Sequence, residues 1–94
     1  MRKIERASSF RKDYKRMKAT PRHRQDGEAL VEAALALLLA DEPLPEKCRD
    51  HALTGNWTGY RECHLKPDLL LIYRKPDSIT LGLARLGSHS ELFG

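Results

Sequence analysis

The sequence lacks most features that mark secreted, membrane or disulfide-rich proteins. Its 94 residues include two cysteines, Cys48 and Cys63, which do not form a CxxC pair. Two cysteines cannot build a disulfide framework, so we expect both to be free thiols. The longest apolar run covers residues 33–40, and a membrane span needs about 18 residues. No apolar stretch follows the basic start of the chain, so we expect a cytoplasmic protein without a membrane partner.

Several kinds of catalytic site are also missing. His51, His64 and His89 are separated by 13 and 25 residues, and no two histidines have the i, i+4 spacing of a helical zinc site. The chain has neither the GxSxG motif of serine hydrolases nor a glycine-rich phosphate loop. We therefore expect no metal ion and no cofactor.

Positive charge is abundant and unevenly distributed. Residues 1–24, called the basic block below, hold ten Lys or Arg and two acidic residues, whereas residues 25–46 hold six acidic residues and no base. A basic block of this kind attracts polyanions such as nucleic acids. A solvated helix face would explain the same charges equally well. His23 lies in this block, and we expect it to face solvent or a nucleic acid without a chemical role.

The apolar pattern predicts a single α+β domain over residues 1–94. We expect an early strand near residues 2–7, a helix capped by Ser8 or Ser9 and ending near Ala19, and a second helix that starts at Thr20-Pro21 and is firm from about Asp26. After a loop at residues 46–56, strands are predicted at residues 57–65, 69–73 and 79–86, followed by a final helical turn. Short turns between the strands favour an antiparallel sheet, with the helical hairpin packed on one face.

The last 44 residues contain three histidines together with carboxylates and an arginine, a set that suits RNA cleavage. The 2′-hydroxyl of RNA is a built-in nucleophile, so the enzyme needs a base, an acid and a cation for the phosphoryl charge. Histidine has an unperturbed pKa of about 6.5 and can serve as either acid or base. From these residue types alone, a small RNA-binding protein with incidental histidines remains an alternative.

Two stretches of the sequence resemble a known family. Residues 50–73 fit the pattern D-H-x-L-x-G-x-W-x-G-Y-R-[DE]-x-H-x-x-P-D-x-[IL]-L-I-Y, and residues 85–94 fit R-x-G-[ST]-H-x-x-L-F-G. Together they resemble the YafQ branch of the RelE/ParE superfamily of bacterial toxins. The resemblance implies a RelE-like β-α-α-β-β-β two-layer fold. It also implies a metal-independent endoribonuclease that enters the ribosomal A site and cuts the mRNA there.

The same resemblance implies partners and active-site residues. The partners are a cognate antitoxin, the ribosome and mRNA, and a higher-order assembly could bind operator DNA through the antitoxin. The positions that match active-site residues are His51, His64, Asp68 and His89. His89 would be the main proton-transfer group and the acid for the leaving oxygen. His51 and His64 would act as base or phosphate ligands, and Asp68 would orient an imidazole or the ribose.

Three further residues receive roles from the resemblance. Arg85 is the candidate cation for the transition state, and Phe93 matches a terminal aromatic that stacks on a base. Glu62 stands where a close relative carries aspartate, and we place it with Phe93 among the substrate-binding residues. The alternative function is a superfamily member that does not cleave RNA but binds another target, as the ParE toxins do.

Overall fold

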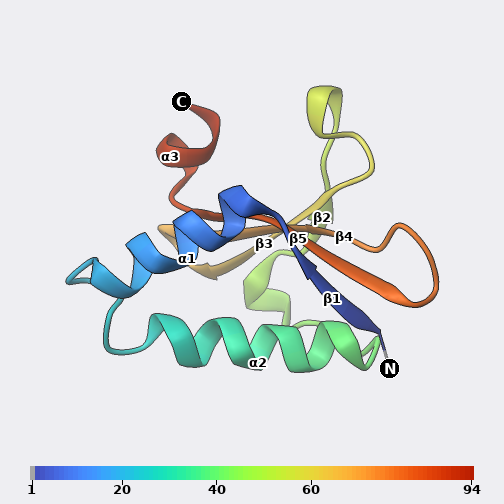
Figure 1. Cartoon of the computed structure of the whole chain (residues 1–94), viewed down its shortest axis with the longest axis horizontal. Helices are drawn as coiled ribbons and strands as arrows, with labels where there is room; N and C mark the ends of the chain where they lie inside the picture. Colours follow the sequence, from blue (N-terminus) through green and yellow to red (C-terminus); the bar gives the residue numbers. More distant parts are fainter. Residues whose placement is uncertain (1) are drawn as a thin grey trace.

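The computed structural model describes residues 2–94, which form one five-stranded sheet with the order β1-β5-β4-β3-β2 (Figure 1). The strands are β1 (Lys3–Arg6), β2 (His51–Ala52), β3 (Arg61–Lys66), β4 (Leu69–Arg74) and β5 (Thr80–Gly87). Strands β3 to β5 pair antiparallel, as predicted, β2 also pairs antiparallel with β3, and β1 pairs parallel to β5. The α+β class and the RelE-like plan are confirmed, with the first strand adding a parallel edge.

Helices α1 (Ser8–Ala19) and α2 (Gly27–Leu39) cover one face of the sheet, and α3 (His89–Phe93) lies on the other face (Figure 1). The main core lies between the helical hairpin and the sheet and includes Phe10, Met17, Val31, Leu38, Cys63, Leu71, Tyr73, Leu81, Leu83 and Leu86. A smaller apolar cluster on the other face joins Leu70, Ile72 and Leu92, with Leu53, Trp57, Tyr60 and Ala84 packed against it. Within residues 2–94, no helix is long and apolar enough to cross a membrane.

The predicted helix caps are wrong. Ala7 is the N-cap of α1 and makes no side-chain bond, while the Ser9 hydroxyl donates to the Ala84 carbonyl at 2.9 Å instead. Thr20 ends α1, because its hydroxyl donates back to the Arg16 carbonyl at 2.8 Å, so turns occupy residues 20–26. The firm start of α2 near Asp26 is confirmed, since Asp26 is its N-cap.

The region before β3 is more ordered than predicted. The expected loop at residues 46–56 contains a 3-10 turn, η1 (Glu46–Cys48), and the two-residue strand β2. The strand predicted from Trp57 starts at Arg61 instead. A second 3-10 turn, η2 (Gly55–Trp57), precedes it, and the positive φ angles of Gly55 and Gly59 interrupt the extended backbone.

Candidate active site

The strand register places four predicted or neighbouring residues in one row across the sheet. His51 on β2 pairs with Glu62 on β3, Glu62 pairs with Ile72 on β4, and Ile72 pairs with Arg85 on β5. Directly opposite residues of antiparallel strands share a face. Ile72 packs against Leu92 of α3, so this row lies on the face opposite α1 and α2, called the open face below.

A buried carboxylate on the open face contacts two histidines. Glu62 is only 5% exposed, and its Oε2 atom lies 3.2 Å from Nε2 of His51 and 3.4 Å from Nε2 of His64. The two imidazole rings are 6.3 Å apart between centroids. A carboxylate so far removed from water needs partners of this kind. The structure therefore brings three of the predicted site residues into one cluster.

The second ring nitrogen of His51, Nδ1, also has a hydrogen-bond partner. Its Nδ1 lies 2.6 Å from the Arg49 carbonyl oxygen, so an acceptor faces each of its ring nitrogens. Both ring nitrogens of His51 therefore have protein partners. His64 has one such acceptor, Glu62, and its other nitrogen is available to receive a proton.

Asp50 anchors the start of β2 beside this cluster. Its carboxylate accepts hydrogen bonds from the Tyr73 hydroxyl at 2.6 Å and from Nε and Nη2 of Arg61, both at 3.3 Å. The bond with Asp50 raises the pKa of the Arg61 guanidinium, and burial, with this bond adding to it, raises the pKa of the Tyr73 hydroxyl. Because Asp50 directly precedes His51, these bonds fix where β2 begins.

His89 belongs to a second group of side chains on the same side of the sheet. It is the first residue of α3, and its ring centroid lies 4.9 Å from that of Phe93. Phe93 in turn meets Trp57 of η2 edge to face, with centroids 6.2 Å apart. Helix α3 is held by a capping box between Ser88 and Glu91. Trp57 itself packs against the apolar cluster of the open face.

Arg85 is held by an acidic residue of α1. Its Nε donates to Oδ2 of Asp13 at 2.7 Å and its Nη2 to Oδ1 at 3.3 Å, and this pairing raises the pKa of the guanidinium. Asp13 is 3% exposed and also accepts from the backbone N–H of Leu86 at 3.0 Å. Arg85 thus has a fixed position, and its remaining N–H groups can still bind a phosphate.

A β-bulge turns Arg85 towards the open face. Ile72 pairs with Arg85 and Tyr73 with Leu83, so Ala84 is one extra residue on β5. Leu83 and Leu86 both lie in the main core on either side of this bulge. Bulges of this kind change the direction of a side chain and are common beside active sites.

Asp68 lies apart from the histidine cluster, before β4. Its Oδ2 atom pairs with Nε of Arg22 at 3.2 Å and lies 3.9 Å from Nε2 of His23. The prediction for His23 is wrong, because this side chain is only 5% exposed and its Nδ1 has no hydrogen-bond partner within residues 2–94. It packs beside Gly27, where an added Cβ would lie 3.4 Å from the Cβ of His23.

The chain is similar to known proteins over nearly its whole length. Residues 2–94 match the family model described as "Bacterial toxin of type II toxin-antitoxin system, YafQ". The chain belongs to the YafQ family. It is 40% identical over 93 residues to the mRNA interferase toxin YafQ of Escherichia coli K12, a match that covers 99% of this chain and 97% of the relative.

Solved structures of YafQ proteins and related toxins have the same fold. The E. coli DinJ–YafQ complex contains a chain that matches with a TM-score of 0.85 at 36% identity, covering 100% of both chains. A metal-bound toxin from Helicobacter pylori matches with a TM-score of 0.86 at 44% identity, covering 99% of this chain and 100% of that chain. In residues 2–94 of the present protein, no group of three His, Cys, Asp or Glu side chains is placed to hold a metal ion.

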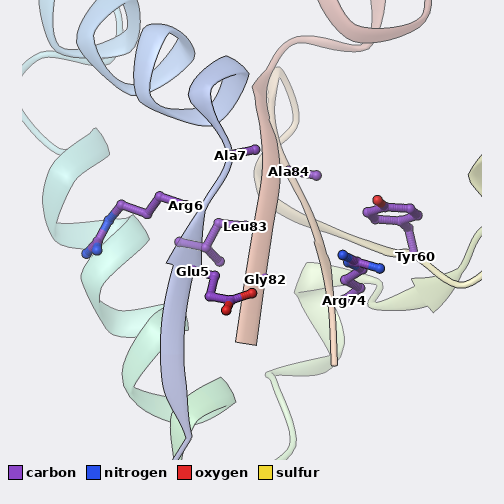
Figure 2. Close-up of a pocket in the computed structure, with 8 residues that line it drawn as sticks. All are labelled: Glu5, Arg6, Ala7, Tyr60, Arg74, Gly82, Leu83 and Ala84. Atoms are coloured by element: carbon purple, nitrogen blue, oxygen red, sulfur yellow. The ribbon is translucent and has the colours of Figure 1, made fainter. Parts of the chain in front are cut away.

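A hollow without any of the predicted site residues lies next to the row on the open face. It measures about 240 Å³. In Figure 2, the Tyr60 ring and the Arg74 guanidinium form one wall, and Glu5 reaches in over Gly82 from the opposite side. The guanidinium carbon of Arg74 lies 5.4 Å from the centroid of the Tyr60 ring. Arg74 is thus held by a cation–π contact, not by a carboxylate.

Two residues that shape the site received no role from the sequence, namely Asp13 and Asp50. Asp50 stands inside the family motif, next to His51. Asp13 carries a signal of its own, because it occupies a buried position between Phe10 and Met17 on α1. An acidic side chain on the buried stripe of a helix predicts a buried cationic partner. That partner, Arg85, lies 72 residues later, which sequence spacing alone cannot show.

Proposed function

We propose that this member of the YafQ family is an mRNA interferase. It is a ribosome-dependent endoribonuclease that cuts mRNA in the ribosomal A site and so inhibits translation. Membership of the family and the name of the E. coli relative support this activity. In the chain itself, the observation that carries the proposal is the buried carboxylate of Glu62 between the Nε2 atoms of His51 and His64. This cluster can move protons on the open face of a basic protein.

The reaction follows the chemistry of RNA. A base removes the proton of the 2′-hydroxyl, the 2′-oxygen attacks the neighbouring phosphorus, and the bond from phosphorus to the 5′-oxygen breaks. An acid gives its proton to the departing 5′-oxygen. The products are a 2′,3′-cyclic phosphate and a 5′-hydroxyl, and no metal ion takes part. Each well-placed acid or base contributes roughly 10²–10⁴-fold to the rate.

We assign these roles among the histidines as follows. His89 donates the proton to the leaving oxygen, and Phe93, whose ring is 4.9 Å away, stacks on a base of the substrate. His64 has a nitrogen free to accept the proton of the 2′-hydroxyl. His51 lies beside the phosphate, with its ring nitrogens facing Glu62 and the Arg49 carbonyl, and Glu62 orients both rings.

Arg85 and Asp68 support the reaction from the edges of the site. Arg85 stabilises the phosphoryl charge of the transition state with the N–H groups that Asp13 leaves free. Asp68 holds the ribose at a distance from the histidine cluster, and its pairing with Arg22 connects this part of the site to the basic block. The basic block docks on ribosomal RNA.

A cognate antitoxin silences the toxin. The E. coli DinJ–YafQ complex supports this partnership, since its toxin chain matches over 100% of both chains. An assembly of the two proteins binds operator DNA through the antitoxin. Co-expression of the neighbouring short acidic reading frame should restore growth and yield a complex on purification. Failure of every neighbouring frame to do so would remove the antitoxin from the proposal.

Primer extension on a translated mRNA tests the activity. We expect cuts within the A-site codon only when ribosomes are present, and His89→Gln should reduce cutting by several orders of magnitude. Lys75→Gln, a change in the turn after β4 and outside the basic block, is the matched control and should keep most of the activity. Toxicity without cuts would favour a superfamily member that binds another target. Activity lost in EDTA and restored by a divalent cation would contradict the metal-free route.

A further inference from the structure

A second hollow lies at the edge of the sheet, between η1 and the end of β3. It measures about 320 Å³ and is lined by Lys47, Arg49, His64, Leu65, Lys66 and Pro67. His64 also belongs to the cluster around Glu62, so the hollow begins where the candidate active site ends. None of the lining residues is acidic. A chemical group bound in this hollow would therefore lie next to a group bound at His51 and His64.

The cations of this hollow are not neutralised by the protein. Lys47 and Arg49 are exposed, and neither makes an ion pair with any residue in the range 2–94. Lys66 is different, because its Nζ donates to the Arg22 carbonyl at 2.6 Å and to Asp26 at 3.2 Å. Two unpaired cations beside a histidine, with no carboxylate among them, favour an anionic ligand.

The backbone at Arg49 is held in an unusual conformation. Arg49 has φ 51° and ψ 43°, the left-handed region that is unfavourable for a residue with a side chain. Its N–H donates to the Glu46 carbonyl at 2.9 Å, and its carbonyl accepts from Nδ1 of His51 at 2.6 Å. Strain of this kind persists where surrounding contacts fix it, often at functional sites. Because the Arg49 carbonyl is hydrogen-bonded to His51, the Arg49 side chain extends from a backbone whose position is fixed relative to His51.

We propose that Lys47 and Arg49 form a subsite for a backbone phosphate of the RNA that neighbours the cleaved link. The subsite rests on the proposed function, because an RNA strand with its scissile phosphate at His51 and His64 continues past His64 into this hollow. Phosphate contacts from Lys and Arg set the register of a strand without reading its sequence. The subsite would thus place the 2′-hydroxyl in line for attack, whatever the codon.

Synthetic mRNAs with one neutral methylphosphonate test this subsite on programmed ribosomes. Each mRNA replaces a different phosphodiester around the A-site codon, except the scissile one, and single-turnover cleavage is measured. We expect the unmodified protein to lose about tenfold in rate at one neighbouring position. Lys47→Gln combined with Arg49→Gly should cleave natural mRNA more slowly by a similar factor and show no further loss at that position.

The variants are chosen so that misfolding does not imitate the result. Arg49→Gly removes the guanidinium at a position where glycine relieves the backbone, so the protein should be at least as stable as the parent. Arg49→Lys keeps the charge and should retain most of the sensitivity. Lys75→Gln removes a cation elsewhere, in the turn after β4 and outside the basic block, and should keep the full sensitivity.

Three results would overturn the subsite. The first is a parent protein that is insensitive to every methylphosphonate, and the second is a double variant that keeps the parental sensitivity. In both of these the protein still cuts mRNA, so the proposed function survives while the subsite is lost. The third is an intact protein that never cuts translated mRNA, which removes the proposed function and the subsite together.

Discussion

The carboxylate of Asp13 on α1 accepts a hydrogen bond from Nε of Arg85 at 2.7 Å, across 72 residues of sequence. Asp13 also pairs with Arg16 at 3.1 Å, and Arg16 pairs with Glu91 of α3 at 3.3 Å. One buried acid therefore connects the basic helix, the candidate phosphate cation and the helix that carries His89.

Asp13→Asn should weaken both stability and cleavage. It removes the charge that holds the half-buried Arg85, so we expect a loss of about 2 kcal/mol in the free energy of unfolding in urea. The cleavage rate should fall about tenfold or more because Arg85 is no longer fixed. In an Arg85→Ala background, where this pair is already absent, Asp13→Asn should lower stability by less and cause no further loss of cleavage. A further loss of cleavage there would show that Asp13 does not act through Arg85.

Glu62→Gln should impair cleavage while preserving the fold. Both imidazoles contact the same carboxylate oxygen, and an amide oxygen in its place lacks the negative charge that strengthens these contacts, so both rings are held less firmly and can shift. Misplaced imidazoles should slow single-turnover cleavage about a hundredfold. Circular dichroism should remain that of the parent. Glu62→Asp is the matched control, because it keeps the charge, and it should retain more activity than Glu62→Gln.

Lowering the pH should weaken the capping box that holds α3. The backbone N–H of Ser88 donates to Glu91 at 2.8 Å and holds the pKa of that carboxyl below its usual value of 4.5. This contribution is fully present above pH 4.5 and is lost as the pH falls through the lowered pKa. Phe93 contacts Trp57, the single tryptophan, so its fluorescence reports the change.

The matched variants for this acid transition are Glu91→Gln and Asp77→Asn. Glu91→Gln should loosen α3 at neutral pH and abolish the transition. The carboxyl of Asp77 also has a lowered pKa, mainly because it accepts from the Ile79 N–H, but Asp77 lies in the turn before β5. Asp77→Asn should therefore leave the tryptophan signal unchanged. A transition that persists in Glu91→Gln would assign it to another group.

Neither cysteine should react in the folded protein. Cys63 is fully buried in the main core, and burial raises the pKa of its thiol well above the usual range. Because the thiolate is the reactive form, a disulfide reagent at pH 8 should modify the Cys48→Ser variant at least about a hundredfold faster after unfolding in urea than before. Fast modification of the native variant would mean that the core opens at β3.

The sequence pattern predicts the helices and long strands because each places enough apolar residues on one face. Strand β2 has two residues, His51 and Ala52, which are too few to show an alternating pattern. The contact of His51 with Glu62 depends on that pairing, so it could not be predicted from spacing. The alternation of side chains along β3 puts Glu62 and His64 on the same face, where the two side chains are in contact.

The family motif identified candidate site residues, although the spacing of these residues in the sequence does not show how their side chains are arranged. It led to His51, Glu62 and His64, which the structure brings together, and to His89 and Phe93, which form their own group. It did not indicate that Asp68 pairs with Arg22 or that Arg85 is held from α1. These contacts join distant segments through the tertiary fold, and no local pattern in the chain records them.

The parallel pairing of β1 with β5 affects the stage of protein synthesis at which the sheet can be completed. Lys3 lies opposite Thr80 and Arg6 opposite Leu83, so the first strand has no partner until most of the protein has been made. A pairing between the two ends of a chain must overcome the entropy of closing nearly its whole length, which slows folding. During synthesis, Ile4 remains uncovered and the β5 edge is still missing. The finished sheet, and with it the row that holds Arg85, therefore assembles only after translation of the toxin is almost over.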